Sequence, residues 1–218
     1  MDHHTAPRFE AAALVSIDVQ RDTLDGRPLE IPGTSAALAV MAALAGAFRR
    51  AGRPIVHVVR LYREDAGNVD LCRRGLVESG ARILVPGDEG AELAPGLAPD
   101  GAAGLDGDAL LAGDLQTLGP AEWAMYKPRW GAFYETGLED HLRGLGVDTL
   151  AFCGVNFPNC PRTSIYEASE RDFRIVVAPD AVSGIYDRGR AELEGIGVVL
   201  MDAAALAEAT QGARAVAG

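Results

Sequence analysis

The sequence contains few cysteines and no long hydrophobic run, and both absences narrow the class of protein. Its three cysteines (Cys72, Cys153 and Cys160) match neither a disulfide framework nor a zinc ribbon, and no Cys-x-x-Cys pair is present, so we expect reduced thiols. No stretch reaches the roughly 18 consecutive apolar residues of a membrane span. The start, MDHHTAPRFE, lacks the apolar centre of a secretory signal. Together these features predict a cytoplasmic protein with no membrane partner.

Basic residues are also scarce relative to acidic ones. Twenty Lys and Arg stand against 31 Asp and Glu, which gives a formal net charge of -11. That charge has the wrong sign for neutralising the phosphates of a nucleic acid or the head groups of an anionic membrane. We therefore expect no nucleic-acid partner.

What the sequence does contain is an alternation of apolar, β-branched runs with amphipathic segments. The runs predict six strands, at residues 13–19, 54–61, 122–127, 147–155, 174–179 and 197–201. The amphipathic segments predict helices between 34 and 52, between 136 and 145, and at 160–172, 187–195 and 202–211. Strands that are apolar on both faces are typical of a parallel sheet covered by helices on both sides. The pattern predicts one α/β domain over residues 1–218 with a mostly parallel, six-stranded central sheet.

One long segment departs from this alternation. Residues from about 62 to 120 lose periodicity and are rich in Gly, Pro and Asp, so we expect an irregular excursion with a short strand near 82–85. A loop of this length inside a domain is typical of a functional or mobile segment. A solvated insertion is the alternative.

Three reactive side chains follow separate predicted strands. Asp18 lies at the end of the first strand, Lys127 ends the strand at 122–127, and Cys160 follows the strand at 147–155. Because ligands of parallel α/β sheets bind at the carboxyl ends of strands, we expect these three residues to share one site. Each alone would have an ordinary role in a turn or in the core. The interior positions of Cys153 and His57 within apolar strands predict plain core residues.

The residues around Cys160 predict its chemistry. Pro161 is favoured at the first position of a helix, which would make Cys160 the N-cap residue. A thiol at a helix N-terminus beside the Lys127 ammonium is expected to ionise near neutral pH. The backbone N–H groups of Asn156 and Cys160 are the expected oxyanion hole, and Asp18 is the expected base. This set predicts acyl transfer.

The segments that carry these residues resemble the isochorismatase-like cysteine hydrolases, which include nicotinamidases, N-carbamoyl amidohydrolases and ureidoacrylate hydrolases. The resemblance lies in IDVQRD (17–22), KPRWGAF (127–133), GVNFPNC (154–160) and DAVSG (180–184). It implies a Rossmann-like three-layer α/β/α fold and an Asp18–Lys127–Cys160 catalytic triad. It also implies a non-proline cis peptide between Val155 and Asn156, and a homo-oligomer, either a dimer or a tetramer.

Departures from the family pattern narrow the expected activity. Nicotinamidases carry an Asp-x-His metal motif after the second strand, where this chain has RLYRED (60–65) without histidine. We therefore expect no metal, no cofactor and a substrate other than nicotinamide. Phe157, Pro158 and Pro161 also differ from the residues often found there in the family, which predicts a reshaped pocket wall.

The sequence thus predicts a metal-independent cysteine amidohydrolase that cleaves a C–N bond of a small amide, ureide or lactam through a thioester. One alternative is a non-catalytic binding or regulatory module with the same fold, and another is a redox-sensing thiol at Cys160. Trp130, Phe133, Tyr134 and Phe157 are candidates for the walls of the substrate pocket, and a position in the core is the alternative for each.

Overall fold

The computed structural model describes residues 2–213 and contains one mixed sheet. Its strands are β1 (Ala12–Ile17), β2 (Ile55–Val59), β3 (Gln116–Gly119), β4 (Glu122–Tyr126), β5 (Thr149–Gly154), β6 (Arg174–Val182) and β7 (Val199–Leu200). They lie in the order β3-β4-β2-β1-β5-β6-β7. Every neighbouring pair is parallel except β3 with β4. The α/β fold with a mostly parallel central sheet is confirmed, and the sheet has seven strands rather than six.

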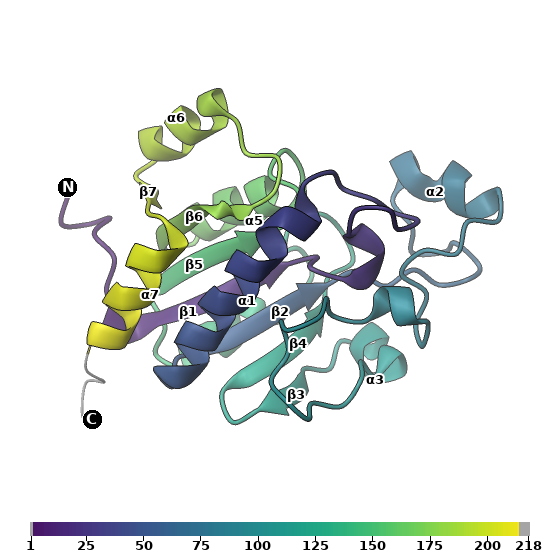
Figure 1. The fold of residues 1–218 in the computed structure, drawn as a ribbon, viewed down its shortest axis with the longest axis horizontal. Coiled ribbons are helices and arrows are strands. Elements are labelled where there is room, and N and C mark those ends of the chain that lie inside the picture. Colours follow the sequence, from purple (N-terminus) through teal and green to yellow (C-terminus); the bar gives the residue numbers. More distant parts are fainter. Residues whose placement is uncertain (1, 214–218) are drawn as a thin grey trace.

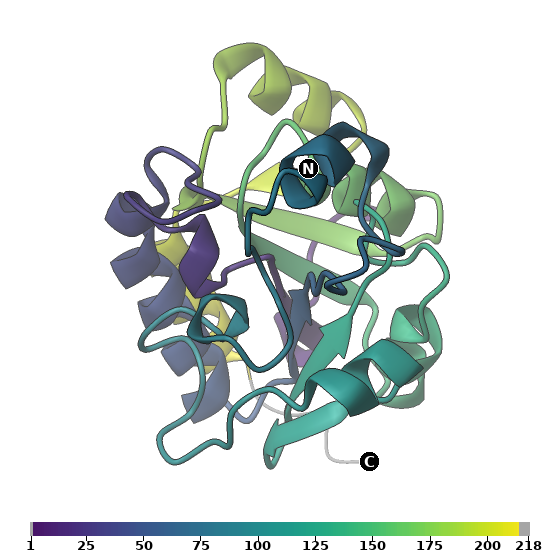
Figure 2. The ribbon, with the colours of Figure 1, turned by 90° about the vertical axis from the view of Figure 1, so that its right-hand side faces the viewer.

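Helices cover both faces of the sheet (Figure 1, Figure 2). The helices are α1 (Thr34–Arg50), α2 (Leu71–Glu78), α3 (Gly107–Ala112), α4 (Leu138–Gly144), α5 (Cys160–Ser169), α6 (Asp187–Gly195) and α7 (Ala203–Gly212), with 3-10 turns η1 (Phe9–Ala11), η2 (Arg21–Thr23) and η3 (Glu89–Ala91). α1 and α7 pack together on one face, and α4 and α5 lie on the other. This is the three-layer arrangement that the resemblance implied.

One hydrophobic core forms on each face of the sheet, because successive strand residues point to opposite faces. In β1, Leu14 packs into the core beneath α1 and α7, whereas Val15 packs into the core beneath α4 and α5. β5 repeats the alternation, with Cys153 on the first side and Phe152 on the second. Cys153 is therefore a buried core residue, as its sequence context predicts, and burial raises the pKa of its thiol to about 12.

The segment from 62 to 120 is more regular than its composition indicates. It forms α2, η3, α3 and β3, and β3 adds an antiparallel edge to β4. The prediction of a strand near 82–85 is wrong: Leu84 lies in the left-handed region (φ 51°), and the chain turns there. Leu93, Leu97 and Leu110 join the core beneath α1, which explains why much of the excursion is ordered against the sheet.

A buried polar network crosses the first core at the centre of the sheet. The Nδ1 atom of His57 lies 2.7 Å from the hydroxyl of Ser16, and its Nε2 atom lies 2.7 Å from Glu122 Oε1. Arg49 donates two hydrogen bonds to the same carboxylate, at 2.6 and 2.7 Å. His57 is thus a hydrogen-bonded core histidine, as predicted from its position in a strand.

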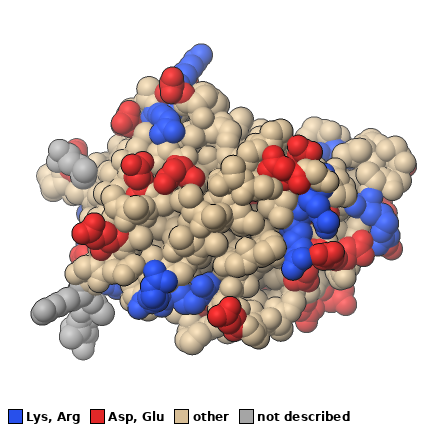
Figure 3. Space-filling view, viewed as in Figure 1, with Lys and Arg blue, Asp and Glu red and all other residues tan. Residues whose placement is uncertain are grey.

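Charged side chains on the face covered by α1 and α7 lie in small, separate groups (Figure 3). Acidic and basic groups alternate across this face, so it presents no continuous basic band of the kind that follows a phosphate backbone. Within residues 2–213, no helix combines the length and the apolar character needed to cross a bilayer.

The Glu122 network predicts a loss of stability in acid. Burial alone would raise the pKa of Glu122, but the hydrogen bonds from Arg49 and His57 outweigh it and hold the pKa below its ordinary value of 4.5. The ionised form therefore stabilises the fold above pH 4.5, and this contribution is lost as the pH falls through the lowered pKa. Urea denaturation should show that Glu122→Gln lowers the free energy of unfolding by about 3 kcal/mol at pH 7 and by less in acid.

Glu208→Gln is the matched control, because Glu208 is exposed on α7 and should leave the free energy of unfolding nearly unchanged. A loss for Glu122→Gln that is constant from pH 7 to pH 3 would contradict the role of the ionised carboxylate.

Candidate active site

Asp18 leaves β1 in an unusual backbone conformation. Its φ of 53° lies in the left-handed region, which residues other than glycine seldom adopt. Its N–H donates to the carbonyl of Val58 at 2.9 Å, and its own carbonyl accepts from the N–H of Gln20 at 2.9 Å. The chain therefore turns sharply at the carboxyl edge of the sheet, where Asp18 Oδ2 comes to lie 2.9 Å from Lys127 Nζ.

Lys127 follows β4, two strands away from β1, and its side chain is 0% exposed. Its ammonium reaches across the end of β2 to Asp18 and also donates to the carbonyl of Arg129 at 3.2 Å. A buried cation is stable only with a nearby anion, and Asp18 supplies it. The second carboxylate oxygen of Asp18, Oδ1, is buried and has no hydrogen-bond partner among the described residues. Asp18 therefore retains one acceptor that the ion pair does not use.

Cys160 is the first residue of α5, so the prediction that it is the N-cap residue is wrong by one position. Asn159 occupies the N-cap, and Pro161 falls within the first turn. Burial raises the pKa of the Cys160 thiol to about 12, and Asp18 raises it further while Lys127 lowers it. Burial and the Asp18 carboxylate therefore oppose the resting thiolate that the sequence predicts, whereas Lys127 favours it.

The loop after β4 is fixed to α5 by side-chain hydrogen bonds. Ser164 donates to the carbonyl of Cys160 at 2.7 Å and accepts from the N–H of Ala132 at 3.0 Å. Glu167 accepts from the N–H of Phe133 at 2.9 Å. These contacts hold the segment after Lys127 against the helix that begins with Cys160.

The turn between β5 and α5 is made by Gly154 with trans peptide bonds. Its φ is +132°, and a Cβ atom there would collide with the carbonyl oxygen of Ile17. All peptide bonds of the described residues are trans, so the predicted cis bond between Val155 and Asn156 is wrong. The change of direction occurs at Gly154 instead, and the N–H of Val155 remains bonded to Ile17 O at 2.9 Å.

Two backbone N–H groups of this turn are free. Those of Asn156 and Cys160 have no acceptor among the described residues, whereas the intervening N–H of Phe157 donates to the carbonyl of Ser183 at 2.8 Å. Ser183 belongs to the DAVSG segment noted in the sequence. The free groups are the two that the sequence assigned to an oxyanion hole, and they flank the start of α5.

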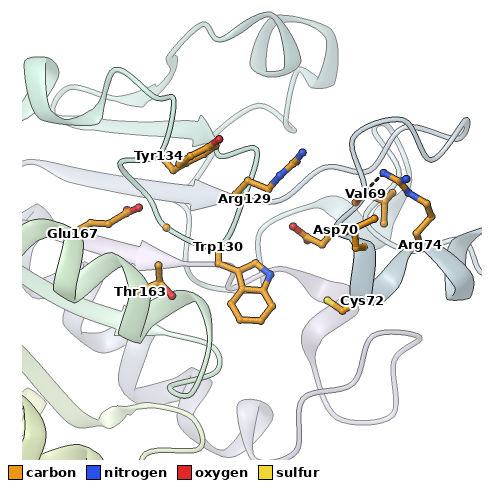
Figure 4. Close-up of a pocket in the computed structure, with 11 residues that line it drawn as sticks. Val69, Asp70, Cys72, Arg74, Arg129, Trp130, Tyr134, Thr163 and Glu167 are labelled. Atoms are coloured by element: carbon orange, nitrogen blue, oxygen red, sulfur yellow. Dashed lines mark hydrogen bonds between the residues drawn. The ribbon is translucent and has the colours of Figure 1, made fainter.

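A cavity of about 590 Å³ lies between α2 and α5 (Figure 4), and Asp18, Lys127 and Cys160 are not among the residues that line it. Its wall includes Thr163, one turn beyond Cys160, together with Trp130 and Tyr134. The remaining lining residues are Val69, Asp70, Leu71, Cys72, Arg74, Arg129, Gly131 and Glu167. Trp130 and Tyr134 thus lie in the cavity wall, as expected of pocket residues.

Phe133 and Phe157, the other two candidates for the pocket wall, do not line this cavity. Phe133 is buried against Phe173, with ring centroids 5.9 Å apart, and Phe157 packs edge-on against Tyr186 at 5.4 Å. Both belong to the core beneath α4 and α5. An apolar side chain in this loop gains more from the core than from a solvated cavity.

Arg60 is a buried residue near the site for which the sequence predicts no role. Its guanidinium donates to the carbonyl of Lys127 at 2.6 Å and to Asp70 Oδ2 at 2.7 Å. Gln20 is also completely buried, and its side chain bonds the backbone of Arg60 and of Ala91. The sequence signal that could have identified Arg60 is its position as a basic residue near the end of the apolar run PIVHVVRL. Lys127 was identified by the same signal at the end of the run at 122–127.

The residues around Asp18 do not fit a divalent metal. Lys127 contacts Asp18 directly, and Arg60 lies close enough to interact with it, so cations already compensate this carboxylate. Among the described residues, the one group of three with metal-like spacing is Asp2, His3 and His4, which is exposed near the N-terminus.

Comparison with known proteins places this chain in a family. The isochorismatase domain matches residues 12–204, so the chain belongs to the isochorismatase family. A maleamate amidohydrolase of Pseudomonas putida is 28% identical over 174 residues, which cover 78% of this chain and 71% of that protein. A protein of Arabidopsis thaliana described as a probable inactive nicotinamidase is 26% identical over 200 residues, which cover 88% of this chain and 93% of that protein.

A solved structure gives the same result. An isochorismatase family protein from Desulfovibrio vulgaris superimposes with a TM-score of 0.77 and 30% sequence identity, covering 91% of this chain and 97% of that chain. The family resemblance inferred from the sequence is confirmed.

The close approach at Gly154 predicts that this position tolerates no side chain. Gly154→Ala should lower the free energy of unfolding in urea by at least about 3 kcal/mol, because Cβ would push β5 away from Ile17. Gly144→Ala is the control: nothing lies within 4 Å of a Cβ atom there, and alanine in α4 should stabilise by up to about 1 kcal/mol. Equal effects of the two substitutions would argue against the close approach.

The raised pKa of Cys160 predicts how its alkylation depends on pH. Only the thiolate reacts, so the rate with iodoacetamide should rise about tenfold per pH unit from pH 7 to pH 10. Mass spectrometry of the peptide containing Cys160 measures this rate, and Cys160→Ser gives the background. A rate that levels off below pH 8 would show that the thiol ionises near neutrality, contrary to the structure.

Proposed function

We propose that the protein is a cysteine amidohydrolase that acts on a small molecule without a metal. The observation that carries this proposal is the meeting of Asp18, Lys127 and Cys160 at the carboxyl edge of the sheet, with one free carboxylate oxygen and two free N–H groups. The relative from Pseudomonas putida is named as an amidohydrolase, which supports the same reaction type.

In the first half of the proposed reaction, Asp18 accepts the proton of the Cys160 thiol as Sγ attacks the amide carbonyl carbon. A C–S bond forms, and the carbonyl oxygen becomes an oxyanion that accepts hydrogen bonds from the N–H groups of Asn156 and Cys160. Asp18 then gives its proton to the amide nitrogen, the C–N bond breaks, and the amine leaves. A protonated thiol at rest suits this sequence, since the base beside it removes the proton only during attack.

In the second half, a water molecule attacks the carbonyl carbon of the thioester and passes a proton to Asp18. The C–S bond breaks, the carboxylic acid leaves, and Asp18 returns the proton to the thiolate. The net reaction converts one amide and one water into one acid and one amine. Lys127 has two roles in this scheme: it orients Asp18 through the 2.9 Å contact, and its charge stabilises the transient thiolate.

A non-catalytic binding module is the second candidate function. The raised pKa of the thiol and the name of the Arabidopsis relative, a probable inactive nicotinamidase, favour it. In that case the cavity beside Trp130 and Thr163 would bind the small molecule, and no bond would be cleaved.

The homo-oligomer implied by the family resemblance stays a prediction. The cytoplasmic location and the absence of a nucleic-acid partner, both expected from the sequence, also stay predictions. α2 has no buried residue, and Leu71 is 82% exposed at the cavity edge. An interface between copies on α2 would therefore border the cavity.

Turnover measurements separate the two functions. In a panel of primary amides, ureides and lactams, the protein should release ammonia or amine from at least one compound. Cys160→Ser should abolish this release, and Asp18→Asn should reduce it by about 10²- to 10⁴-fold. Cys153→Ala, which removes the other buried thiol, should keep turnover. Full turnover by Cys160→Ala would contradict the proposal, and binding without any release would favour the binding module.

A further inference from the structure

Three arginines on α2 and in the loop after β4 have no carboxylate partner among the described residues. Arg74 and Arg129 line the cavity, whereas Arg73, which precedes Arg74 on α2, is not one of the lining residues. None of the three has a carboxylate oxygen within 4.0 Å among the described residues, whereas Arg60 nearby is paired with Asp70 at 2.7 Å. A chain with a net charge of -11 thus keeps two cations without a carboxylate partner in the wall of one cavity, and a third beside them on α2.

Arg73 is connected to the site by hydrogen bonds. One guanidinium nitrogen of Arg73 donates to the hydroxyl of Tyr62 at 3.0 Å, and that hydroxyl donates to Asp70 Oδ2 at 3.0 Å. Arg60 donates to the same Asp70 oxygen and to the carbonyl of Lys127. The chain of contacts fixes Arg73 relative to the Asp18–Lys127 pair and leaves its other guanidinium nitrogens without a hydrogen-bond partner among residues 2–213.

The charge of Arg73 also acts on the reactive groups. Burial alone would lower the pKa of Arg73, but Tyr62, Cys160 and Asp18 raise it above its ordinary value. Interactions of this kind require a short separation through a partly buried medium. Arg73 therefore lies close enough to Cys160 and Asp18 for its charge to act on both.

The two carboxylates of the cavity wall do not cancel this charge. Asp70 is neutralised by Arg60. Glu167 lies on α5, on the opposite side of the cavity from Arg74 (Figure 4), and one of its oxygens accepts from the N–H of Phe133. The cavity is thus cationic toward α2 and anionic toward α5.

We propose that Arg73, assisted by Arg74 and Arg129, binds a carboxylate of the substrate, so that the protein selects amides that carry a negative charge. The proposal rests on the proposed function and specifies its substrate class. A guanidinium matches a carboxylate in shape and charge, and hydrogen bonds between ions are the stronger ones. Because the net charge of the protein repels anions, a local cationic cluster is what such a substrate requires.

Alkylation of Cys160 by two matched reagents tests anion selection without any turnover. Iodoacetate carries a carboxylate where iodoacetamide carries a carboxamide, and the two reagents are otherwise the same. The rate of alkylation of Cys160 by iodoacetate, divided by the rate with iodoacetamide, is measured at pH 9 by mass spectrometry. The ratio should fall about tenfold in Arg73→Gln, the loss expected for one hydrogen bond between ions. Cys72→Ser serves as the common background, because Cys72 lines the same cavity.

Two variants control for the charge and for the fold. Arg73→Lys keeps the cation and should retain part of the preference for iodoacetate. Arg50→Gln removes the same charge from an exposed position at the end of α1 and should leave the ratio unchanged. A ratio that is equal in the parent and in Arg73→Gln would overturn the proposal.

Binding of an unreactive pair gives a second measure if the buried thiol resists both reagents. Succinamate and succinamide are titrated into Cys160→Ser protein and followed by tryptophan fluorescence, since Trp130 lines the cavity. Succinamate should bind at least about tenfold more tightly, and Arg73→Gln should remove the difference. Equal affinities, or no binding of succinamate, would overturn the arginine proposal. Neither result would bear on whether Cys160 performs hydrolysis, which the turnover measurements decide separately.

Discussion

The ion pair between Lys127 and Asp18 is the interaction on which the rest of the site depends. A completely buried ammonium requires an anion, and Asp18 can supply it because β1 ends in a left-handed turn that directs its side chain along the sheet edge. The pair spans the end of β2, where Arg60 bonds the backbone of Lys127. Three charged groups from distant parts of the chain are thereby held together at one edge of a mostly parallel sheet.

The same burial that strengthens this pair keeps the neighbouring thiol neutral. A thiolate at rest would need more positive charge than Lys127 alone provides, since Asp18 opposes ionisation. The site is therefore better suited to a thiol that loses its proton to Asp18 during attack than to a permanently ionised nucleophile. This arrangement also limits oxidation of Cys160 at rest, because oxidation follows thiolate character and exposure.

Much of this structure follows from local sequence patterns, and the rest depends on long-range packing. Six strands were predictable because their residues are apolar on both faces, whereas β3, with the sequence QTLG, carries little apolar signal at its antiparallel edge. Asp18, Lys127 and Cys160 were predictable because each follows a strand. Arg73 was not, because its position depends on how an irregular segment folds back over the sheet. Phe133 and Phe157 show a different limit of sequence-based prediction. The local sequence around an aromatic residue near a site does not tell whether its side chain lies in the wall of the pocket or in the hydrophobic core.

The most direct test of the account is the mass of the protein during turnover. With an amide that it hydrolyses, protein quenched in acid should carry the mass of the acyl group on the peptide containing Cys160, and the adduct should disappear after substrate is exhausted. An adduct on another residue would contradict a thioester route at this site. Sustained hydrolysis with no adduct on Cys160 at any time during turnover would contradict it as well.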